Sequence, residues 1–228
     1  MILLTEFFRK HPARNSEFDA CLNENIKNPL ITKIVLFIDD PSVEPDERFT
    51  QNEKITIHKI HSRPTYQDFF TYANQNFENE FCILANADII VGQDIKQIES
   101  RNSKEEFYAL TRWDLKKKED GTFSSVFFEN SRGIAQASQD TWIFKTPVNI
   151  KGCDFSMGRP GCDNKLAHLA KESGYKVTNP SLAIKTYHLH ESGIRNYSGR
   201  DIVPGPWQVV PATDSLNKLS DTTGHWPF

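Results

Sequence analysis

The chain has 228 residues, 38% of them hydrophobic and 25% charged, which is the composition of a globular protein and excludes a disordered or fibrous one. Its 27 Lys and Arg residues against 30 Asp and Glu residues give a net charge of −3, so no overall positive field favours nucleic acid as a partner. The opening run MILLTEFF is short for a secretory signal, and no apolar stretch approaches the roughly 18 residues of a membrane span. We therefore expect no transmembrane segment.

The first 90 residues alternate apolar runs with amphipathic segments. In chain order they predict a strand at 2–5, a helix at 16–27 that begins at Ser16 and is closed by Pro29, strands at 31–40 and 54–60, a helix at 65–77 capped by Thr65 with Asp68, and a strand at 81–85. This order predicts an α/β fold with a mostly parallel sheet. Ligands collect beyond the carboxyl ends of such strands, where Asp39, Asp40, Asn86 and Asp88 follow apolar runs.

The triplet Asn86-Ala87-Asp88 is the first candidate site. Residues two apart on an extended chain point to the same side, so we expect both polar side chains to project together. Carboxylate oxygens are the ligands that Mg²⁺ and Mn²⁺ prefer, commonly together with substrate phosphates. The alternative is that Asp88 caps a turn or pairs with a Lys or Arg.

The second half of the chain adds further candidates. The patterns predict a strand at 105–115, a turn at 119–122, a strand at 140–147, a helix that opens near Asp163 and stops at Gly174, and a strand at 182–190 that carries His188 and His190 on one side. Asp163 is either a helix cap or a general base at a cleft. The two histidines are either ordinary polar groups or ligands of a transition metal.

The end of the chain, from 198 to 228, has several prolines and glycines and little periodicity. We expect an irregular extension packed on the same single domain as residues 1–197, anchored by Trp207, Trp226 and Phe228. The four cysteines form no C-x-x-C pair, which favours reduced thiols and a cytoplasmic location. The oligomeric state is not indicated.

Taken together, residues 1–197 resemble a GT-A nucleotide-sugar glycosyltransferase of the inverting, metal-dependent type. The motifs that carry the resemblance are ANADI, similar to the family's D-x-D or N-x-D motif, and CDNKLAHLAKESGYKV, similar to its catalytic helix. The resemblance implies a GT-A (Rossmann-like) fold, with a mostly parallel central sheet flanked by helices. It also implies transfer from a nucleotide-sugar donor, a UDP-sugar being favoured, to a glycan or other hydroxyl acceptor.

The resemblance also implies roles for particular residues. Asp88 would hold Mn²⁺ or Mg²⁺ on the donor diphosphate, with His190 as a second ligand and His188 as its alternate. Asp163 would be the general base. The implied donor contacts are Thr5 and Asp39 at the base, Arg63 at the base or phosphates, Asn86 at the ribose or the metal's water shell, and Arg112 and Asp140 at the transferred sugar. Arg112 and Asp114 could instead simply form an ion pair.

Two other classes of function use the same residues. A nucleotidyltransferase or phosphohydrolase would use Asp39, Asp88 and Asp163 with a metal. The sequence has no Gly-rich phosphate-binding loop that would favour this class. A non-catalytic nucleotide-sugar-binding protein is favoured only by the asparagine at position 86, where the family usually has an aspartate.

Overall fold

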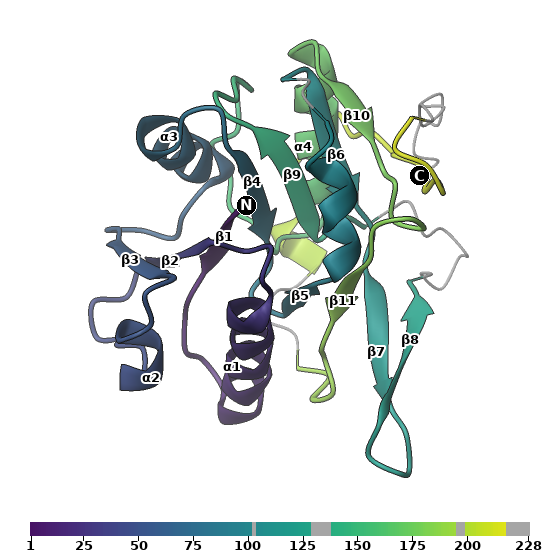
Figure 1. Ribbon diagram of the computed structural model, residues 1–228. Coiled ribbons are helices and arrows are strands. Elements are labelled where there is room, and N and C mark those ends of the chain that lie inside the picture. Colours follow the sequence, from purple (N-terminus) through teal and green to yellow (C-terminus); the bar gives the residue numbers. More distant parts are fainter. Residues whose placement is uncertain (102–103, 129–137, 195–198, 218–228) are drawn as a thin grey trace.

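A computed structural model describes residues 1–101, 104–128, 138–194 and 199–217 (Figure 1). The helices are α1 Pro12–Lys27, α2 Glu47–Thr50, α3 Tyr66–Asn76 and α4 Cys162–Glu172, with 3-10 turns η1 Gln93–Ile98 and η3 Gly199–Asp201. The strands are β1 Ile2–Glu6, β2 Lys33–Ile38, β3 Ile55–Lys59, β4 Phe81–Ala85, β5 Ile89–Val91, β6 Glu106–Leu110, β7 Trp113–Lys117, β8 Phe123–Phe127, β9 Thr141–Lys145, β10 Lys176–Thr178 and β11 Thr186–His188.

The centre of the molecule is a seven-stranded sheet in the order β10-β6-β9-β4-β1-β2-β3. All neighbouring pairs are parallel except those of β9, which runs antiparallel to β4 and to β6. The predicted α/β fold with a mostly parallel sheet is therefore confirmed. Its inner strands are buried on both faces, which explains why β2 and β4 read as continuous apolar runs without alternation.

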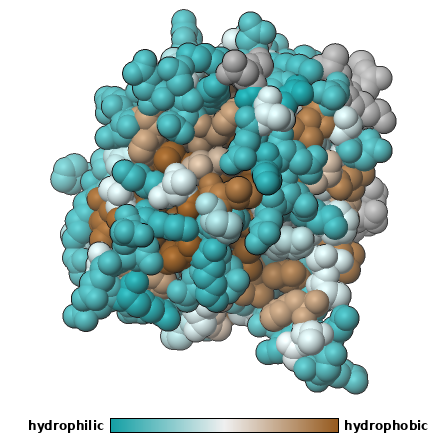
Figure 2. Space-filling model, in the orientation of Figure 1, coloured by the Kyte–Doolittle hydropathy of each residue, from teal (hydrophilic) through white to brown (hydrophobic). Residues whose placement is uncertain are grey.

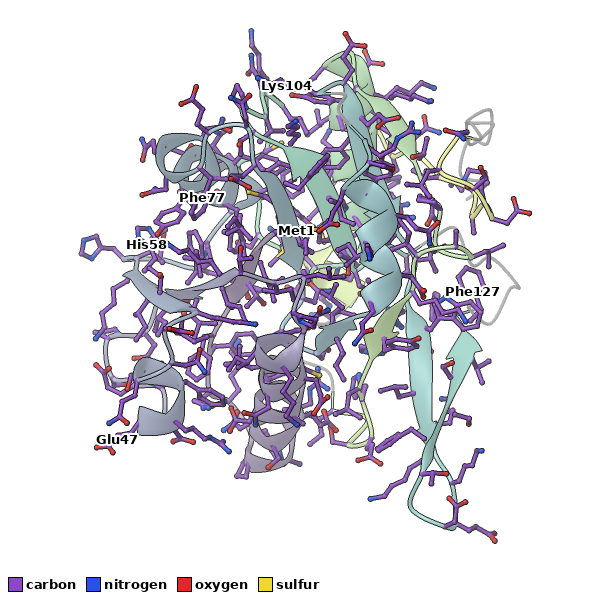
Figure 3. The ribbon with its side chains drawn as sticks, in the orientation of Figure 1. Met1, Glu47, His58, Phe77, Lys104 and Phe127 are labelled. Atoms are coloured by element: carbon purple, nitrogen blue, oxygen red, sulfur yellow. The ribbon has the colours of Figure 1, made fainter. Side chains whose placement is uncertain are left out.

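Helices cover both faces of this sheet (Figure 1). One hydrophobic cluster joins α3 and α4 to one face, with Trp142 of β9 fully buried at its centre. The other cluster joins α1, α2 and η1 to the opposite face. At the outer margin, His58 of the edge strand β3 packs its ring at 4.8 Å from that of Phe37 (Figure 3). Because both faces of the sheet are packed, the positions of the strand ends are fixed. The polar residues that follow the strands are therefore held in place as well.

A second sheet, in the order β5-β11-β7-β8, lies beside the first. Strands β7 and β8 form a hairpin that extends away from the body, and its outer tip, residues 116–122, is hydrophilic (Figures 1 and 2). At the base of the hairpin, the ring of Phe127 packs 5.2 Å from that of Trp113 (Figure 3). This sheet was not predicted, because β5 has only three residues and because β7 and β11 overlap segments predicted as longer strands without assigned partners.

Two predicted helix boundaries are confirmed and one is wrong. Thr65 and Asp68 form a reciprocal capping box on α3, and Gly174, with φ +89°, follows the end of α4. Helix α1, however, begins at Pro12 and not at Ser16. Proline is favoured in the first turn of a helix, and the Ser16 hydroxyl, 3.2 Å from the Pro12 carbonyl oxygen, donates back into the helix and does not cap it.

The predicted strands at 105–115 and 182–190 are also wrong in extent. The first is two strands in different sheets, because the N–H of Thr111 donates to the side chain of Asn179 at 3.1 Å and the chain leaves β6 there. The second is reduced to β11. Its first residues form a turn in which the N–H of Ile184 donates to the Pro180 carbonyl at 2.8 Å.

The described part of the C-terminal segment runs along α4. The N–H of Gln208 donates to the Asn164 carbonyl at 2.9 Å, and Trp207 contacts Gly161. Trp226 and Phe228 lie outside the described residues, as does Arg195. Within the described residues, no helix combines the length and apolar character needed to cross a bilayer. All four cysteines are buried and unpaired.

Candidate functional site

A cavity of about 470 Å³ lies at the carboxyl ends of β1, β2 and β4. It is lined by nine of the ten residues that the sequence analysis assigned to the donor, the metal or the base: Asp39, Arg63, Asn86, Asp88, Arg112, Asp140, Asp163, His188 and His190. The tenth, Thr5, is buried on β1 and lines a neighbouring space of about 20 Å³. Candidates from seven separate segments of the sequence therefore meet in one place.

Three of these side chains form a group that could hold a cation. An oxygen of Asp88 and one ring nitrogen each of His188 and His190 lie within 4.8 Å of one another. His188 is oriented by Asp114, whose Oδ1 is 2.7 Å from Nδ1, so that Nε2 faces Asp88 Oδ2 at 3.3 Å. His190 Nε2 is buried and has no hydrogen-bond partner among the described residues. An imidazole held by a carboxylate through one nitrogen, and a second imidazole with an orphaned nitrogen, fit a metal site.

The protonation states in this group differ from one another. Burial would raise the pKa of Asp88, but His188 and Arg14 outweigh it and hold that pKa well below its usual range. Burial would lower the pKa of His188, but hydrogen bonds to Asp114 and Asp88 raise it to about 9. Burial and the charges of Arg14 and His188 lower the pKa of His190. At pH 7 the group therefore contains a carboxylate, an imidazolium and a neutral imidazole.

Asn86 and Asp88 both line the cavity, but not for the predicted reason of an extended chain. Residues 86–88 form a turn and not an extended strand, and the N–H of Ile89 donates to the Asn86 carbonyl at 3.2 Å. The Asn86 amide donates to Asp140 Oδ1 at 2.9 Å, whereas Asp88 faces the imidazole of His188. The triplet thus places its two polar side chains in different parts of the cavity.

Ion pairs connect the metal group to both ends of the cavity. They form one chain of alternating charge in the order Glu17, Arg14, Asp88, His188, Asp114, Arg112 and Asp140. Arg112 lies 2.9 Å from Asp114 and 2.9 Å from Asp140, so the ion pair that the sequence analysis left open does form. When His188 is neutral, this chain contains four carboxylates and two guanidinium groups. Its net charge is then −2, which a divalent cation would balance.

Asp163 lies in the first turn of α4 and faces the same cavity. Its Oδ2 accepts from the N–H of Gln139 at 2.9 Å and its Oδ1 from the N–H of Asn164 at 3.0 Å. Burial, assisted by the charge of Asp140, outweighs these hydrogen bonds and raises the pKa of Asp163 to about 7. A carboxyl group with a pKa near the ambient pH suits general base catalysis.

Comparison with solved structures identifies the architecture, whereas no protein-family model and no curated protein sequence matches the chain. The structure of residues 1–349 of TarS from S. aureus, in complex with UDP-GlcNAc, superimposes with a TM-score of 0.52 at 13% identity over 85% of this chain. The structure of GalNAc-T7 with UDP, GalNAc and Mn²⁺ superimposes with a TM-score of 0.57 at 10% identity over 90% of this chain. The chain has the GT-A fold. It spans 59% and 46%, respectively, of the two matched chains.

The cavity also contains Glu6, a carboxylate that was not predicted from the sequence. Glu6, at the end of β1, is 8% exposed, and its Oε1 lies 3.5 Å from Arg63 Nε. Burial raises the pKa of Glu6 to about 7, although Arg63 opposes the shift. Arg63 in turn donates to the Met157 carbonyl at 2.5 Å. Glu6 follows four apolar or small residues on a strand, and its type alone gave no signal that it faced a cavity.

The raised pKa of Glu6 predicts a pH dependence of stability. The folded protein keeps the Glu6 carboxyl protonated at pH values at which the unfolded chain releases the proton. The folded state therefore has its full stability below about pH 4.5 and loses part of it as the pH rises through about 7, where buried Glu6 must ionise. The Glu6→Gln variant is therefore expected to be more stable than the parent at pH 8, by on the order of 3 kcal/mol, and equal to it near pH 4. Urea unfolding between pH 4 and 8 measures both. Glu53→Gln, which removes an exposed carboxylate, is the control, and an equal loss of stability at every pH in the Glu6 variant would contradict the prediction.

The C-terminal segment forms one wall of the GT-A cavity, close to Asp163. Ile202 and Trp207 line it, and Ile202 is 44% exposed. The Trp207 indole donates to the Val203 carbonyl at 3.0 Å and lies against Gly161. A Cβ at Gly161, whose φ is +76°, would come within 2.8 Å of that indole, so the helix start and the wall fit only with glycine there.

Proposed function

We propose that the protein is a glycosyltransferase that moves a sugar from a nucleoside diphosphate donor, by preference a UDP-sugar, to an acceptor hydroxyl. The observation that carries the proposal is the single cavity that contains both the group Asp88, His188 and His190 and the half-buried carboxyl of Asp163. The GT-A fold supports it. The two matched structures contain UDP-GlcNAc in one case and UDP, GalNAc and Mn²⁺ in the other, which supports the choice of nucleotide.

Asp88, His188 and His190 would hold Mn²⁺ or Mg²⁺. The bound cation would neutralise the charge that develops on the departing diphosphate. Neighbouring residues already orient the proposed ligands. Asp114 fixes the ring of His188, and the Nε2 atom of His190 remains without a partner among the described residues. Two imidazole nitrogens beside a carboxylate favour Mn²⁺ over Mg²⁺, which prefers oxygen ligands.

Asp163 would act as the general base of an inverting transfer. The acceptor oxygen forms a bond to the anomeric carbon while the bond from that carbon to the diphosphate oxygen breaks, and the acceptor proton passes to the Asp163 carboxylate. Two backbone N–H groups hold this carboxylate in place. A fixed base with a pKa of about 7 is ionised in half of the molecules at neutral pH and can still accept a proton.

The remaining cavity residues would bind the donor. Glu6 ends β1, Asp39 follows β2 and Arg63 lies beside Glu6, where they would contact the nucleoside, with Thr5 next to Glu6 on β1. Asn86, Arg112 and Asp140 are joined by hydrogen bonds within the same cavity. We assign that polar patch to the transferred sugar, because a fixed array of donors and acceptors suits hydroxyl groups.

The acceptor would approach along the wall made by Ile202 and Trp207. An apolar wall beside a polar base suits a sugar ring, whose C–H face packs on an indole. The Trp207→Ala variant is expected to raise the KM for a glycan acceptor by roughly two- to tenfold, corresponding to about 0.5–1.5 kcal/mol, without changing the KM for the donor. Trp207→Phe, which keeps an aromatic face, is the matched control. An unchanged acceptor KM in the alanine variant would exclude this role.

Incubation with a panel of UDP-, GDP- and dTDP-sugars plus Mn²⁺ tests the proposed activity. Slow release of sugar and nucleoside diphosphate without an acceptor, accelerated when a glycan is added, is the expected result. Release of pyrophosphate or nucleoside monophosphate would instead indicate a nucleotidyltransferase or phosphohydrolase. Donor binding measured by calorimetry without any turnover would indicate a nucleotide-sugar-binding protein.

A further inference from the structure

Arg14 occupies a position that the proposed chemistry does not explain. It lies on α1, is 5% exposed, and its Nη2 is 2.5 Å from Asp88 Oδ2, the same oxygen that faces His188 Nε2. A guanidinium cannot lose its proton in a protein, so its positive charge is permanent. The carboxylate of the proposed metal group is therefore already paired with a cation.

The contacts around Arg14 hold the guanidinium in this position. Its Nη1 pairs with Glu17, one turn further along α1, and its guanidinium carbon lies 4.7 Å from the centre of the Phe18 ring. Glu17 is itself fixed, because its Oε1 accepts from the N–H of Ser192 at 2.6 Å. The side chain is thus clamped from both sides and cannot move into solvent without breaking buried contacts.

A cation bound to Asp88, His188 and His190 would lie close to this fixed positive charge. Charges of like sign a few ångströms apart repel strongly where water is largely excluded. Arg14 would also have to share or release Asp88 Oδ2. Both effects weaken the binding of a divalent ion by itself. A diphosphate reverses the balance, because Arg14 lines the cavity and a guanidinium pairs well with phosphate oxygens.

We propose that Arg14 couples the metal to the donor: its guanidinium holds Asp88 in the free protein and transfers to the diphosphate when donor and cation bind together. Glu17 would keep Nη1, while Nη2, the nitrogen that pairs with Asp88, would turn to the diphosphate. The inference rests on the proposed function, because it takes a nucleoside diphosphate as the ligand. Coupling of this kind is reciprocal, so the cation strengthens nucleotide binding by the same factor by which the nucleotide strengthens cation binding.

The test measures binding of Mn²⁺ alone, by the electron paramagnetic resonance signal of the free ion. Arg14→Gln is expected to bind Mn²⁺ at least about tenfold more tightly than the parent. Because this variant leaves Glu17 as an unpaired buried carboxylate that could attract the ion, the decisive variant is Arg14→Gln with Glu17→Gln, which keeps the summed charge of the pair unchanged. It too should bind Mn²⁺ more tightly than the parent. Arg14→Lys keeps the positive charge and should bind Mn²⁺ as weakly as the parent.

A second measurement tests the coupling itself, using UDP as the probe. In the parent, saturating UDP should lower the Mn²⁺ Kd by at least about tenfold. In the double variant this factor should be smaller. Calorimetry of UDP binding with and without Mn²⁺ should give the same factor for each protein. Mn²⁺ affinity of the double variant equal to that of the parent would overturn the inference. So would a parent that binds no Mn²⁺ even with UDP, which would remove the metal from the proposed function as well. Altered Mn²⁺ binding without sugar transfer from any donor would refute the transferase activity and leave the coupling intact.

Discussion

The Asp163→Asn variant is expected to bind the nucleotide donor as tightly as the parent and to transfer sugar roughly 10²- to 10⁴-fold more slowly. An amide cannot take the proton of the acceptor hydroxyl, whereas its oxygen can still accept one of the two backbone N–H groups that hold Asp163. Calorimetry with UDP and Mn²⁺ measures binding, and the rate of product formation at saturating donor measures transfer. Unchanged binding together with lost transfer would show that Asp163 acts in the transfer step and not in donor binding.

The pH profile of the parent provides an independent check on the same residue. Because only the ionised carboxyl accepts a proton, and its pKa is raised to about 7, kcat/KM should rise with pH, reach half of its maximum near that pKa and level off about one pH unit above it. The residual rate of Asp163→Asn should lack this rise. Asp154→Asn, which removes an exposed carboxylate from the loop before α4, is the control and should retain the profile of the parent. If Asp163→Asn transferred at the parental rate, the base would have to be another residue.

The sequence predicts those parts of the fold that local signals determine. The capping box of Thr65 and Asp68 starts α3, and the apolar runs of β2 and β4 mark strands buried on both faces. Such features depend on neighbours in the sequence, and they suffice for an α/β sheet of mostly parallel strands. Polar residues directly after these strands then identify the edge where the cavity lies.

The second sheet depends on contacts between distant segments, and this is why the patterns did not reveal it. Strand β5 is too short for a period of two to be recognised. Strand β11 lies within the strand predicted at 182–190, but nothing in its sequence indicates that it pairs with β5 and β7. The break between β6 and β7 has the same origin. It is set by Asn179, which is 68 residues from Thr111 in the chain.

The sequence predicted nine of the residues that line the cavity, Arg63 and Arg112 among them, but it did not indicate Glu6 or Arg14. Asp88 follows and Asp163 opens a recognisable element, whereas Arg14 lies before the predicted helix start at Ser16, in no predicted element. Once α1 is known to begin at Pro12, Arg14 and Glu17 stand one turn apart on one face. Because the predicted helix began four residues too late, the Arg14 guanidinium, which pairs with Asp88, was not recognised as part of the site.

The Asp88→Ala variant is expected to lose metal-dependent donor binding, with the UDP Kd in the presence of Mn²⁺ rising by roughly 100-fold, about 3 kcal/mol. Among the described residues, Asp88 is the one carboxylate in the group with His188 and His190. Without its negative charge, nothing in that group would offset the repulsion between Arg14 and a bound cation. Calorimetry with and without Mn²⁺ measures the loss.

Removing Asp88 also leaves Arg14 and the imidazolium of His188 without a shared partner, so a folding defect must be distinguished from a binding defect. Asp88→Asn keeps the shape of the side chain and its contacts with both neighbours, and Asp94→Asn removes an exposed carboxylate from η1 as the matched control. The asparagine variant should stay folded in thermal unfolding and should still lose the effect of Mn²⁺ on UDP binding. If it bound UDP and Mn²⁺ as tightly as the parent, the divalent ion would have to lie elsewhere, and the chain of ion pairs from Glu17 to Asp140 would be a structural network and not the frame of a metal site.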